Sequence, residues 1–267
     1  MCAVSVQLEA LADEVFDAAA AQGRLGAESR RRPFGEVIWN RAYPDLFFVN
    51  GIIDLVAAQW DVDDAERALR DELPGARYFR VSSRDPMTIS RLGPLLQARG
   101  YEHERRVGMI AASPTPSHVR EGAATGYPLA LVNDQKTWSA FEQSVKIDSM
   151  EHGWTSTVIE QMIGLYRWRA QQTPHRYYLA LDGNKPVGHV GLFQHRATGY
   201  LHGVYVHPAS RRRGLGSALT AAMHEASGAI GCERLTLQCI DDGYLPGYYQ
   251  RLGFRAVGEQ HIWTRPR

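Results

Sequence analysis

Residues 204–220, with the sequence VYVHPASRRRGLGSALT, place a strand, a turn and a helix start in succession, and this constrains the fold more than any other stretch. Residues 204–206 are the β-branched and aromatic types that strands prefer, and Pro208 ends the strand because it cannot donate to a ladder. Gly214 and Gly216 lack a Cβ, so a ligand can approach the backbone closely. The first turn of a helix has unpaired N–H groups and a dipole that favours an anion. The stretch therefore predicts a binding site for a phosphate-bearing ligand.

The spacing of this turn excludes two familiar phosphate sites. Three arginines from residue 211 to residue 213 raise the local positive potential, and the turn has the form R-x-x-G-x-G. A P-loop would need a lysine after its last glycine, and none is present. A dinucleotide fingerprint would need a third small residue where this chain has Leu219.

The pattern as it stands resembles the acetyl-CoA signature of the GNAT superfamily of N-acyltransferases. Residues 246–258, PGYYQRLGFRAVG, are similar to the Y-x-x-x-G-F segment of that family, and a predicted strand at residues 234–240 lies between the two motifs. Residues 176–208 predict an antiparallel meander leading into the signature. The resemblance covers residues 127–267. It implies an α/β (α+β) GNAT fold, with a mixed, mostly antiparallel central sheet flanked by helices.

The resemblance also implies a co-substrate, acetyl-CoA or another short acyl-CoA. No metal is expected, because the three cysteines form no C-x-x-C pair. In the family, the turn wraps the pyrophosphate with backbone amides and the preceding strand offers its backbone to the pantetheine arm, with one backbone N–H, here that of Val206, polarising the thioester. Carried onto this chain, the cofactor-binding residues are Val204, Tyr205, Val206, Arg211, Arg212, Arg213, Gly214, Leu215, Gly216 and Ser217.

Acetyl transfer to an amine needs an acid for the departing thiolate. Thiols have a pKa near 8.5, so a neutral phenol is a workable proton donor. Tyr249 stands where the family places its general acid. Its neighbour Tyr248 would take that place if the alignment were shifted by one residue, and a core tyrosine with a satisfied hydroxyl is the structural alternative.

The same reaction needs a base, because an amine of pKa near 10 is mostly protonated at pH 7. Many family members use a glutamate on the strand before the signature, and this strand has none. His202 is the predicted base, since a similar L-H segment occurs in arylalkylamine N-acetyltransferases and the ordinary histidine pKa suits neutral pH. Strand alternation predicts that His202 shares a face with Val204 and Val206. His189 and His207 are weaker candidates, and a structural histidine is the alternative.

The acceptor side is expected in two helices, at residues 134–147 and 156–171, joined by a loop. Helical spacing places Val158, Met162, Leu165 and either Trp168 or Arg169 on one face. Trp154 is predicted to line the acceptor pocket, whereas Trp168 is expected to be a core or surface aromatic. Asp241 and Asp242 could attract a cationic amine, although Asp-Asp-Gly is also common turn chemistry.

The N-terminal half, residues 1–112, predicts a helix at 5–21, a strand at 35–40 and part of a strand in 44–55. A helix capped by Asp61 or Asp63 and ending at Leu73 follows, then a strand, and a second helix starting at Asp85. Because LQARGYE resembles YQRLGFR, this half is predicted to be a degenerate GNAT-like domain in a tandem. Its acidic helix start would repel a pyrophosphate. An unrelated α/β domain is the alternative.

Residues 113–126, rich in proline and small residues, predict the linker between this half and the acetyl-CoA-binding domain at residues 127–267. The net charge of +1 predicts neither a nucleic-acid nor a membrane partner, and the basic run at residues 30–32 is expected to be a solvated loop. No signal peptide or membrane-spanning run is found. Three cysteines without a C-x-x-C pair suit a reducing compartment, so a cytoplasmic location is expected.

Together these features predict an N-acetyltransferase that moves an acetyl group to a primary amine of a small molecule or peptide, by direct attack in a ternary complex. A non-catalytic acyl-CoA-binding regulatory module is the alternative, and a nucleotide-binding protein of another fold is a third class. The sequence indicates neither the acceptor nor the oligomeric state.

Overall fold

The computed structural model describes residues 3–112 and 127–267, so the predicted linker at 113–126 lies outside the described residues. The strands of the first half are β1 (Glu28–Arg32), β2 (Gly35–Trp39), β3 (Asn50–Ile53), β4 (Tyr78–Ser83) and β5 (Glu102–Ala112). Those of the second half are β6 (Leu129–Leu131), β7 (His175–Asp182), β8 (Lys185–His195), β9 (Thr198–Val206), β10 (Arg234–Ile240) and β11 (Arg255–Pro266).

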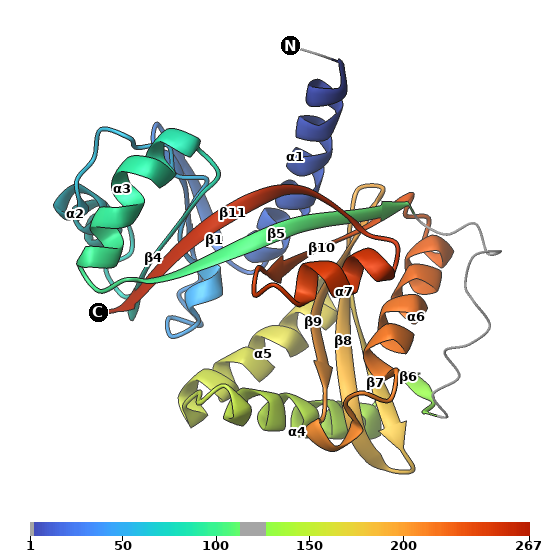
Figure 1. Cartoon of the computed structure of the whole chain (residues 1–267). Helices are drawn as coiled ribbons and strands as arrows, with labels where there is room; N and C mark the ends of the chain where they lie inside the picture. Colours follow the sequence, from blue (N-terminus) through green and yellow to red (C-terminus); the bar gives the residue numbers. More distant parts are fainter. Residues whose placement is uncertain (1–2, 113–126) are drawn as a thin grey trace.

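The α-helices are α1 (Ala3–Arg24), α2 (Val62–Glu72), α3 (Pro86–Ala98), α4 (Gln135–Glu151), α5 (Ser156–Gln172), α6 (Leu215–Ala229) and α7 (Leu245–Arg251). Two single turns of 3₁₀-helix are η1 (Phe47–Val49) and η3 (Pro208–Ser210). All strands join in one sheet of order β1-β2-β3-β4-β11-β5-β10-β9-β8-β7-β6 (Figure 1).

Most predicted elements are confirmed, and the reasons are local. Asp61 caps α2 in a capping box with Asp64, and the Asp85 side chain accepts a hydrogen bond from the N–H of Thr88 to start α3. Two expectations were wrong. Residues 30–32 lie in β1, an edge strand paired with β2, and α4 continues to Glu151, which shortens the predicted loop between α4 and α5.

Both halves repeat one order of elements. In the first half, β2 and β3 are antiparallel, α2 crosses over, β4 runs parallel to β3, and α3 and β5 follow. In the second half, β8 and β9 are antiparallel, α6 crosses over, β10 runs parallel to β9, and α7 and β11 follow. The chain is therefore a tandem of two similar α/β units, as the sequence predicted.

The two units exchange their last strands. β5 ends the first unit but lies between β10 and β11 of the second, and β11 ends the second but lies between β4 and β5 of the first. These two long strands cross the middle of the molecule together (Figure 1). The sheet is consequently continuous, and neither unit completes its own share of it without the other.

The helices cover both faces of this sheet. Val107 and Met109 of β5 face α6 and α7, and Trp263 of β11, which the register places on the same face, packs with α2 and α3. The opposite face carries α1, α4 and α5. Gly108 and the Gly258 paired with it let α1 pack closely, since a Cβ on Gly108 would come within 2.9 Å of the Phe16 ring.

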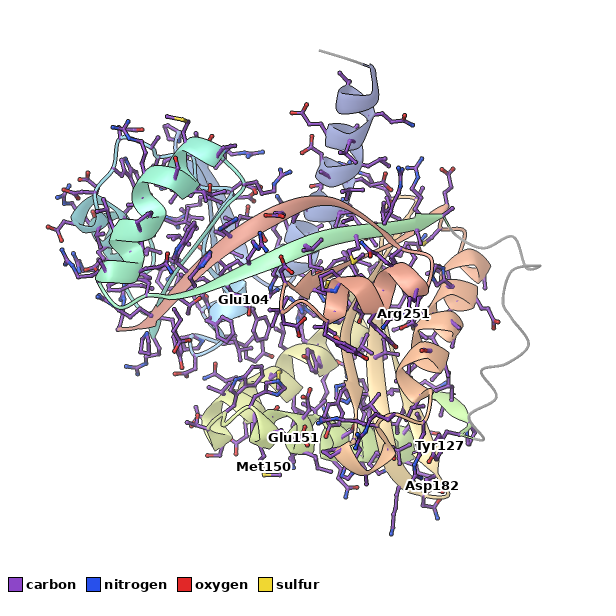
Figure 2. All side chains as sticks on the ribbon, in the orientation of Figure 1. Glu104, Tyr127, Met150, Glu151, Asp182 and Arg251 are labelled. Atoms are coloured by element: carbon purple, nitrogen blue, oxygen red, sulfur yellow. The ribbon has the colours of Figure 1, made fainter. Side chains whose placement is uncertain are left out.

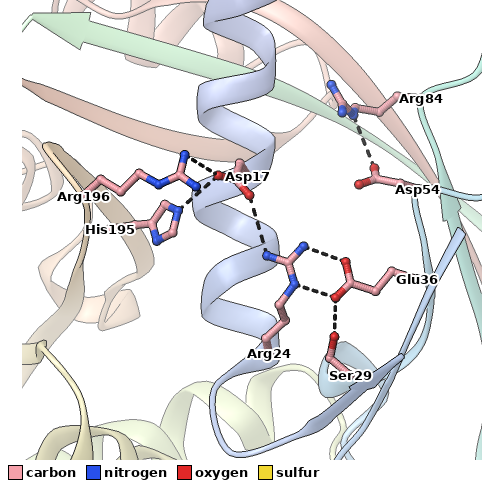
Figure 3. A network of polar contacts seen from close by, with 8 residues as sticks. All are labelled: Asp17, Arg24, Ser29, Glu36, Asp54, Arg84, His195 and Arg196. Atoms are coloured by element: carbon pink, nitrogen blue, oxygen red, sulfur yellow. Dashed lines mark hydrogen bonds and ion pairs between the residues drawn. The ribbon is translucent and has the colours of Figure 1, made fainter. Parts of the chain in front are cut away.

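A network of charges fixes α1 to both units (Figure 3). Asp17 lies 3.1 Å from Nε2 of His195 and 3.3 Å from Arg196, at the β8–β9 turn. On the other side, Arg24 donates two hydrogen bonds of 2.7 Å to Glu36 of β2. The Arg24 guanidinium holds the pKa of Glu36 below its usual value, so this carboxylate stays charged.

Candidate active site

A gap opens in the sheet between β9 and β10. The two strands pair in parallel over four residues, from Thr198 and Arg234 to Leu201 and Leu237, and no pair follows in either described strand. β9 continues to pair with β8 beyond this point, whereas β10 continues with β5. The edge of β9 that faces the gap therefore presents backbone groups to which an extended ligand could bond as an added strand.

A β-bulge at Gly203 sets the directions of the β9 side chains. Gly203 has a φ of 58°, and the register shifts so that His202 pairs with Gly191 while Tyr205 pairs with His189. His202 and Tyr205 therefore share one face, and Val204 and Val206 pack against the α6 side. The prediction that residues 202, 204 and 206 share a face is wrong, because the extra residue breaks the alternation.

The start of α6 leaves its backbone N–H groups open. Its N-cap Gly214 has the left-handed φ of 80° and provides no side-chain cap. A Cβ on Gly216 would lie 2.8 Å from the Tyr248 hydroxyl, so this position is restricted to glycine unless that side chain moves. The matching helix α2 differs, because the Asp61 carboxylate already accepts a hydrogen bond there. Only α6 of this pair offers its first turn to an external anion.

The arginines of the turn have different surroundings. Arg211 donates 2.9 Å to the Val206 carbonyl and 2.6 Å to Glu151, so its side chain orders the turn. Arg212 and Arg213 are exposed, and Arg213 lies 3.5 Å from the Tyr127 hydroxyl. Of the other predicted cofactor residues, Leu215 is buried in the core and Ser217 lies 3.4 Å from the Tyr248 hydroxyl.

A cavity of about 500 Å³ passes through the gap. On the face of the sheet that carries α1 and α5, residues of β4, β11, β5, β10 and β9 line the cavity. Glu104 of β5 is one of these residues and is labelled in Figure 2. On the other side it reaches Cys239 and Tyr249, which belong to the core under α6 and α7. His202 and Trp154 line it as well. The cavity thus brings together the predicted acid, the predicted base and one predicted acceptor residue.

Tyr249 is 7% exposed and lies in the second turn of the short helix α7. Burial, and then the neighbouring Tyr248 and Cys239, raise the pKa of its phenol above the usual value, so it stays protonated at neutral pH. Tyr248 points elsewhere, toward Ser217 at the start of α6. Of the two adjacent tyrosines, Tyr249 is the one that lines the cavity.

His202 lines the cavity with a strongly altered basicity. Burial, followed by the nearby Arg169 and His189, lowers the pKa of His202 to about 3. Its Nε2 is buried without a hydrogen-bond partner among the described residues. The pKa of His202 therefore lies well below the value near 6.5 that suits a base at neutral pH, and its imidazole is neutral at pH 7.

The other two histidine candidates lie away from the cavity lining. His189 is buried, its Nδ1 is 2.8 Å from the Ser144 hydroxyl of α4, and burial lowers its pKa to about 3. His207 accepts a hydrogen bond from the N–H of Ala209 and so caps η3.

These buried histidines predict an acid-sensitive fold. Burial holds the pKa of His175, His189 and His202 below 6.5, so the unfolded chain binds protons that the folded chain does not. Each such group lowers the free energy of unfolding by about 1.4 kcal/mol per pH unit as the pH falls below 6.5. Burial raises the pKa of Asp148 to about 6, so the folded chain binds a proton there that the unfolded chain does not. This carboxyl therefore offsets the effect of one histidine on the stability.

Because burial also lowers the pKa of His103, His224 and His261, urea unfolding at pH 7.5, 6.0 and 5.0 should show the free energy of unfolding falling as the pH falls, with a positive slope against pH. His189→Gln should reduce that slope by about one proton. A slope that is the same in both proteins would contradict the assignment of these shifts.

Asp241, Asp242 and Trp168 do not line the cavity either, and of the predicted cofactor-binding residues only Val204 does. Asp241 pairs with Arg105, and the Asp242 carboxylate accepts from the N–H groups of Tyr244 (2.9 Å) and Leu245 (2.8 Å) at the start of α7. The turn and the ion pair account for the presence of both aspartates at these positions. Neither aspartate lines the cavity, so the cavity does not support their predicted contact with the acceptor. Trp168 packs against Gly26, as expected of a structural aromatic.

The sequence analysis did not identify several charged residues of the cavity as functional candidates. They are Arg80 of β4, Glu104 and Arg106 of β5, and Arg169 of α5. For two of them, the sequence pattern already indicates a charged residue in a buried position. Arg80 stands between Phe79 and Val81 in a strand of buried residues, and Arg169 continues the apolar spacing of Val158, Met162 and Leu165.

Among residues 3–112 and 127–267, no helix has the length and apolar character needed to cross a membrane. The same residues contain no group of three histidine, cysteine, aspartate or glutamate side chains placed to hold a metal ion.

Comparison with known proteins agrees with this geometry. The model of the acetyltransferase (GNAT) family matches residues 140–254, which contain the gap, the open helix start and Tyr249. No curated protein matches the chain. A functionally unknown conserved protein from Staphylococcus epidermidis has a similar structure, with a TM-score of 0.69 and 11% identity over 90% of this chain and 94% of its own.

A GCN5-related N-acetyltransferase from Kribbella flavida aligns with a TM-score of 0.60 and 15% identity over 96% of both chains. Another from Sphaerobacter thermophilus aligns with a TM-score of 0.60 and 16% identity, over 90% of this chain and 76% of its own. At these identities the likeness concerns the fold, and it extends over both units. The family match shows a GNAT acetyltransferase domain at residues 140–254, in the C-terminal half of this chain, and the solved structures share its fold.

Proposed function

We propose that this protein is an acetyl-CoA-dependent N-acetyltransferase that acts on a primary amine in a ternary complex. The observation that carries the proposal is the cavity at the gap between β9 and β10, which brings together Tyr249, His202 and Val204 of the β9 edge. The match of residues 140–254 to the GNAT acetyltransferase family supports the same reaction class.

The residues fit such a co-substrate. The N–H groups of Leu215, Gly216 and Ser217 would hold the pyrophosphate, and the free edge of β9 from Val204 to Val206 would hold the pantetheine arm. Acetyl-CoA, when bound, supplies the thioester carbonyl that the amine attacks and the thiolate that leaves.

Tyr249 donates its phenolic proton to the sulfur as the carbon–sulfur bond breaks and the carbon–nitrogen bond forms. The Val206 N–H stabilises the negative charge on the carbonyl oxygen. With its lowered pKa, His202 is a weak base, so we assign it a hydrogen bond to the amine or to a water that carries the proton away.

A ligand panel tests the binding half of this proposal. Acetyl-CoA at a hundred times its dissociation constant should add about 2.7 kcal/mol to the stability, whereas ATP and NAD should add much less. The measurement is a thermal shift followed by calorimetry. Preference for ATP or NAD would overturn the proposal.

Release of the CoA thiol over a panel of amines tests the catalytic half. Transfer to any amine supports the enzyme. Tight acetyl-CoA binding without release from any amine would favour the regulatory module instead, a reading consistent with the low basicity of His202.

A further inference from the structure

The cavity carries more positive charge than the reaction needs. Its lining contains three guanidinium groups, Arg80, Arg106 and Arg169, against two carboxylates, Asp54 and Glu104. Both carboxylates are engaged, since Glu104 pairs with Arg106 and Asp54 lies 3.4 Å from Arg84. Arg80 and Arg169 are thus left without a carboxylate partner among the described residues.

Arg80 is the more unusual of the two. It is 7% exposed, and its Nε and Nη1 are buried without a hydrogen-bond partner in the described parts of the chain. Burial, and then repulsion from Arg106, lower its pKa to about 10. A buried charge without a partner destabilises a fold by several kcal/mol. A guanidinium kept under these conditions is explained most simply by a ligand that completes it.

Arg169 of α5, which lines the cavity as well, is likewise a buried guanidinium with an unpaired nitrogen among the described residues. It is 2% exposed, donates one hydrogen bond of 2.7 Å to the Gln22 carbonyl, and leaves its Nε without a described partner. Beside the effect of burial, the positive charge of Arg169 lowers the pKa of His202 and opposes the rise in the pKa of Tyr200. The positive charge of Arg106 likewise opposes the rise in the pKa of Tyr200 and adds to burial in lowering the pKa of Arg80. The three arginines therefore share one electrostatic environment along the cavity.

The rest of this side of the cavity is largely aromatic. Phe47, Phe48, Trp154, Tyr166 and Tyr200 line it. Such a lining suits an extended, mainly apolar body with a charged end.

From these observations we propose that the amine acceptor also carries an oxyanion, a carboxylate or a phosphate, which the guanidinium of Arg80 binds with Arg106 beside it. This inference rests on the proposed function. Guanidinium groups bind both oxyanions through paired N–H donors, so the structure assigns their shared chemistry.

The sheet order also sets the length of the acceptor. Four strand spacings separate β4 from β9, which is about 19 Å. Even with the Arg80 side chain extended toward β9, on the order of 10 Å separates its guanidinium from an amine at the gap. A free α-amino acid is too short for this span, whereas three extended residues reach about 10 Å.

The test compares amines that differ only in the distal charge. The arms are tripeptides with a free or an amidated C-terminus, 8-aminooctanoate against heptylamine, and 8-aminooctyl phosphate against 8-aminooctanol. The wild-type protein should acetylate the anionic member of at least one pair with a kcat/KM at least tenfold higher. Whether the tripeptide and aminooctanoate arms or the phosphate arm shows the larger ratio tells the carboxylate from the phosphate source.

Arg80→Gln should reduce that ratio below threefold, mainly through KM for the amine, and leave KM for acetyl-CoA unchanged. Arg80→Lys should restore part of the ratio. Arg67→Gln, which removes an exposed arginine paired with Asp64 on α2, is the matched control and should keep the wild-type ratio. Equal rates for the charged and neutral members, in the wild-type protein, would overturn the inference while leaving the acetyltransferase intact.

Stability provides a second, independent readout. If Arg80 serves binding, Arg80→Gln should leave the free energy of unfolding unchanged or raise it, because a buried charge is removed. A marked loss of stability would make Arg80 a structural residue and overturn its assignment. No transfer to any arm, with acetyl-CoA still bound, would be the distinct failure of the proposed function, and the inference would fail with it.

Discussion

Gly214→Asp should raise the dissociation constant of acetyl-CoA at least 100-fold, which corresponds to about 2.7 kcal/mol. The new carboxylate would occupy the open N–H groups at the start of α6 and repel the pyrophosphate that we place there. Titration calorimetry with acetyl-CoA measures the loss directly. Circular dichroism and the melting temperature show whether the protein remains folded.

The backbone at this position needs a matched control. Gly214 has a φ of 80°, where any L side chain introduces strain. Gly100, after α3 in the first unit, has a φ of 83° and open space around its Cβ direction. Gly100→Asp therefore carries the same strain and charge away from the site, and it should bind acetyl-CoA as the wild type does. Equal affinity in the Gly214 variant would refute the assignment of this turn.

Tyr249→Phe should lower kcat about 100-fold, the lower end of the range for loss of a general acid, with little change in acetyl-CoA affinity. Phenylalanine keeps the aromatic ring, which packs edge-on against Phe254 with 5.7 Å between the ring centroids, so the fold should be retained. Steady-state kinetics of CoA release, with binding measured separately, distinguish the two effects.

Tyr248→Phe is the informative comparison. Its hydroxyl lies 3.4 Å from Ser217 rather than in the cavity lining, so its removal should affect kcat by much less than the Tyr249 change. If the Tyr248 variant loses turnover and the Tyr249 variant does not, the acid role moves to Tyr248. If neither variant is impaired, the thiolate gains its proton from solvent.

Local signals in the sequence predicted most of the elements. The strand, turn and helix at residues 204–220 appear as expected, because proline, glycine and β-branched residues each act over a few positions. The caps Asp61 and Asp85 fixed the starts of α2 and α3 for the same reason. The family resemblance of the C-terminal half followed from two such local motifs.

What escaped prediction depends on contacts between distant residues. The bulge at Gly203 turns His202 to the face of Tyr205, although the alternation of β9 alone predicts otherwise. Residues 102–112 and 255–266 have ordinary strand composition, and nothing in them indicates which neighbours they pair with. Arg80 reaches the cavity only because β11 and β5 place β4 beside the second unit. The low pKa of His202 likewise arises from burial that tertiary packing creates.

The exchange of β5 and β11 has a consequence for the biosynthesis of this protein. When the first unit leaves the ribosome, the place beside β4 is empty, because its occupant β11 is translated more than 140 residues after β5. The nascent chain must carry an exposed strand edge until residue 266 has emerged, and such edges favour aggregation. Completion of both units is thus tied to translation of residues 255–266, so a chain that stops before them leaves the sheet of the first unit incomplete along with that of the second.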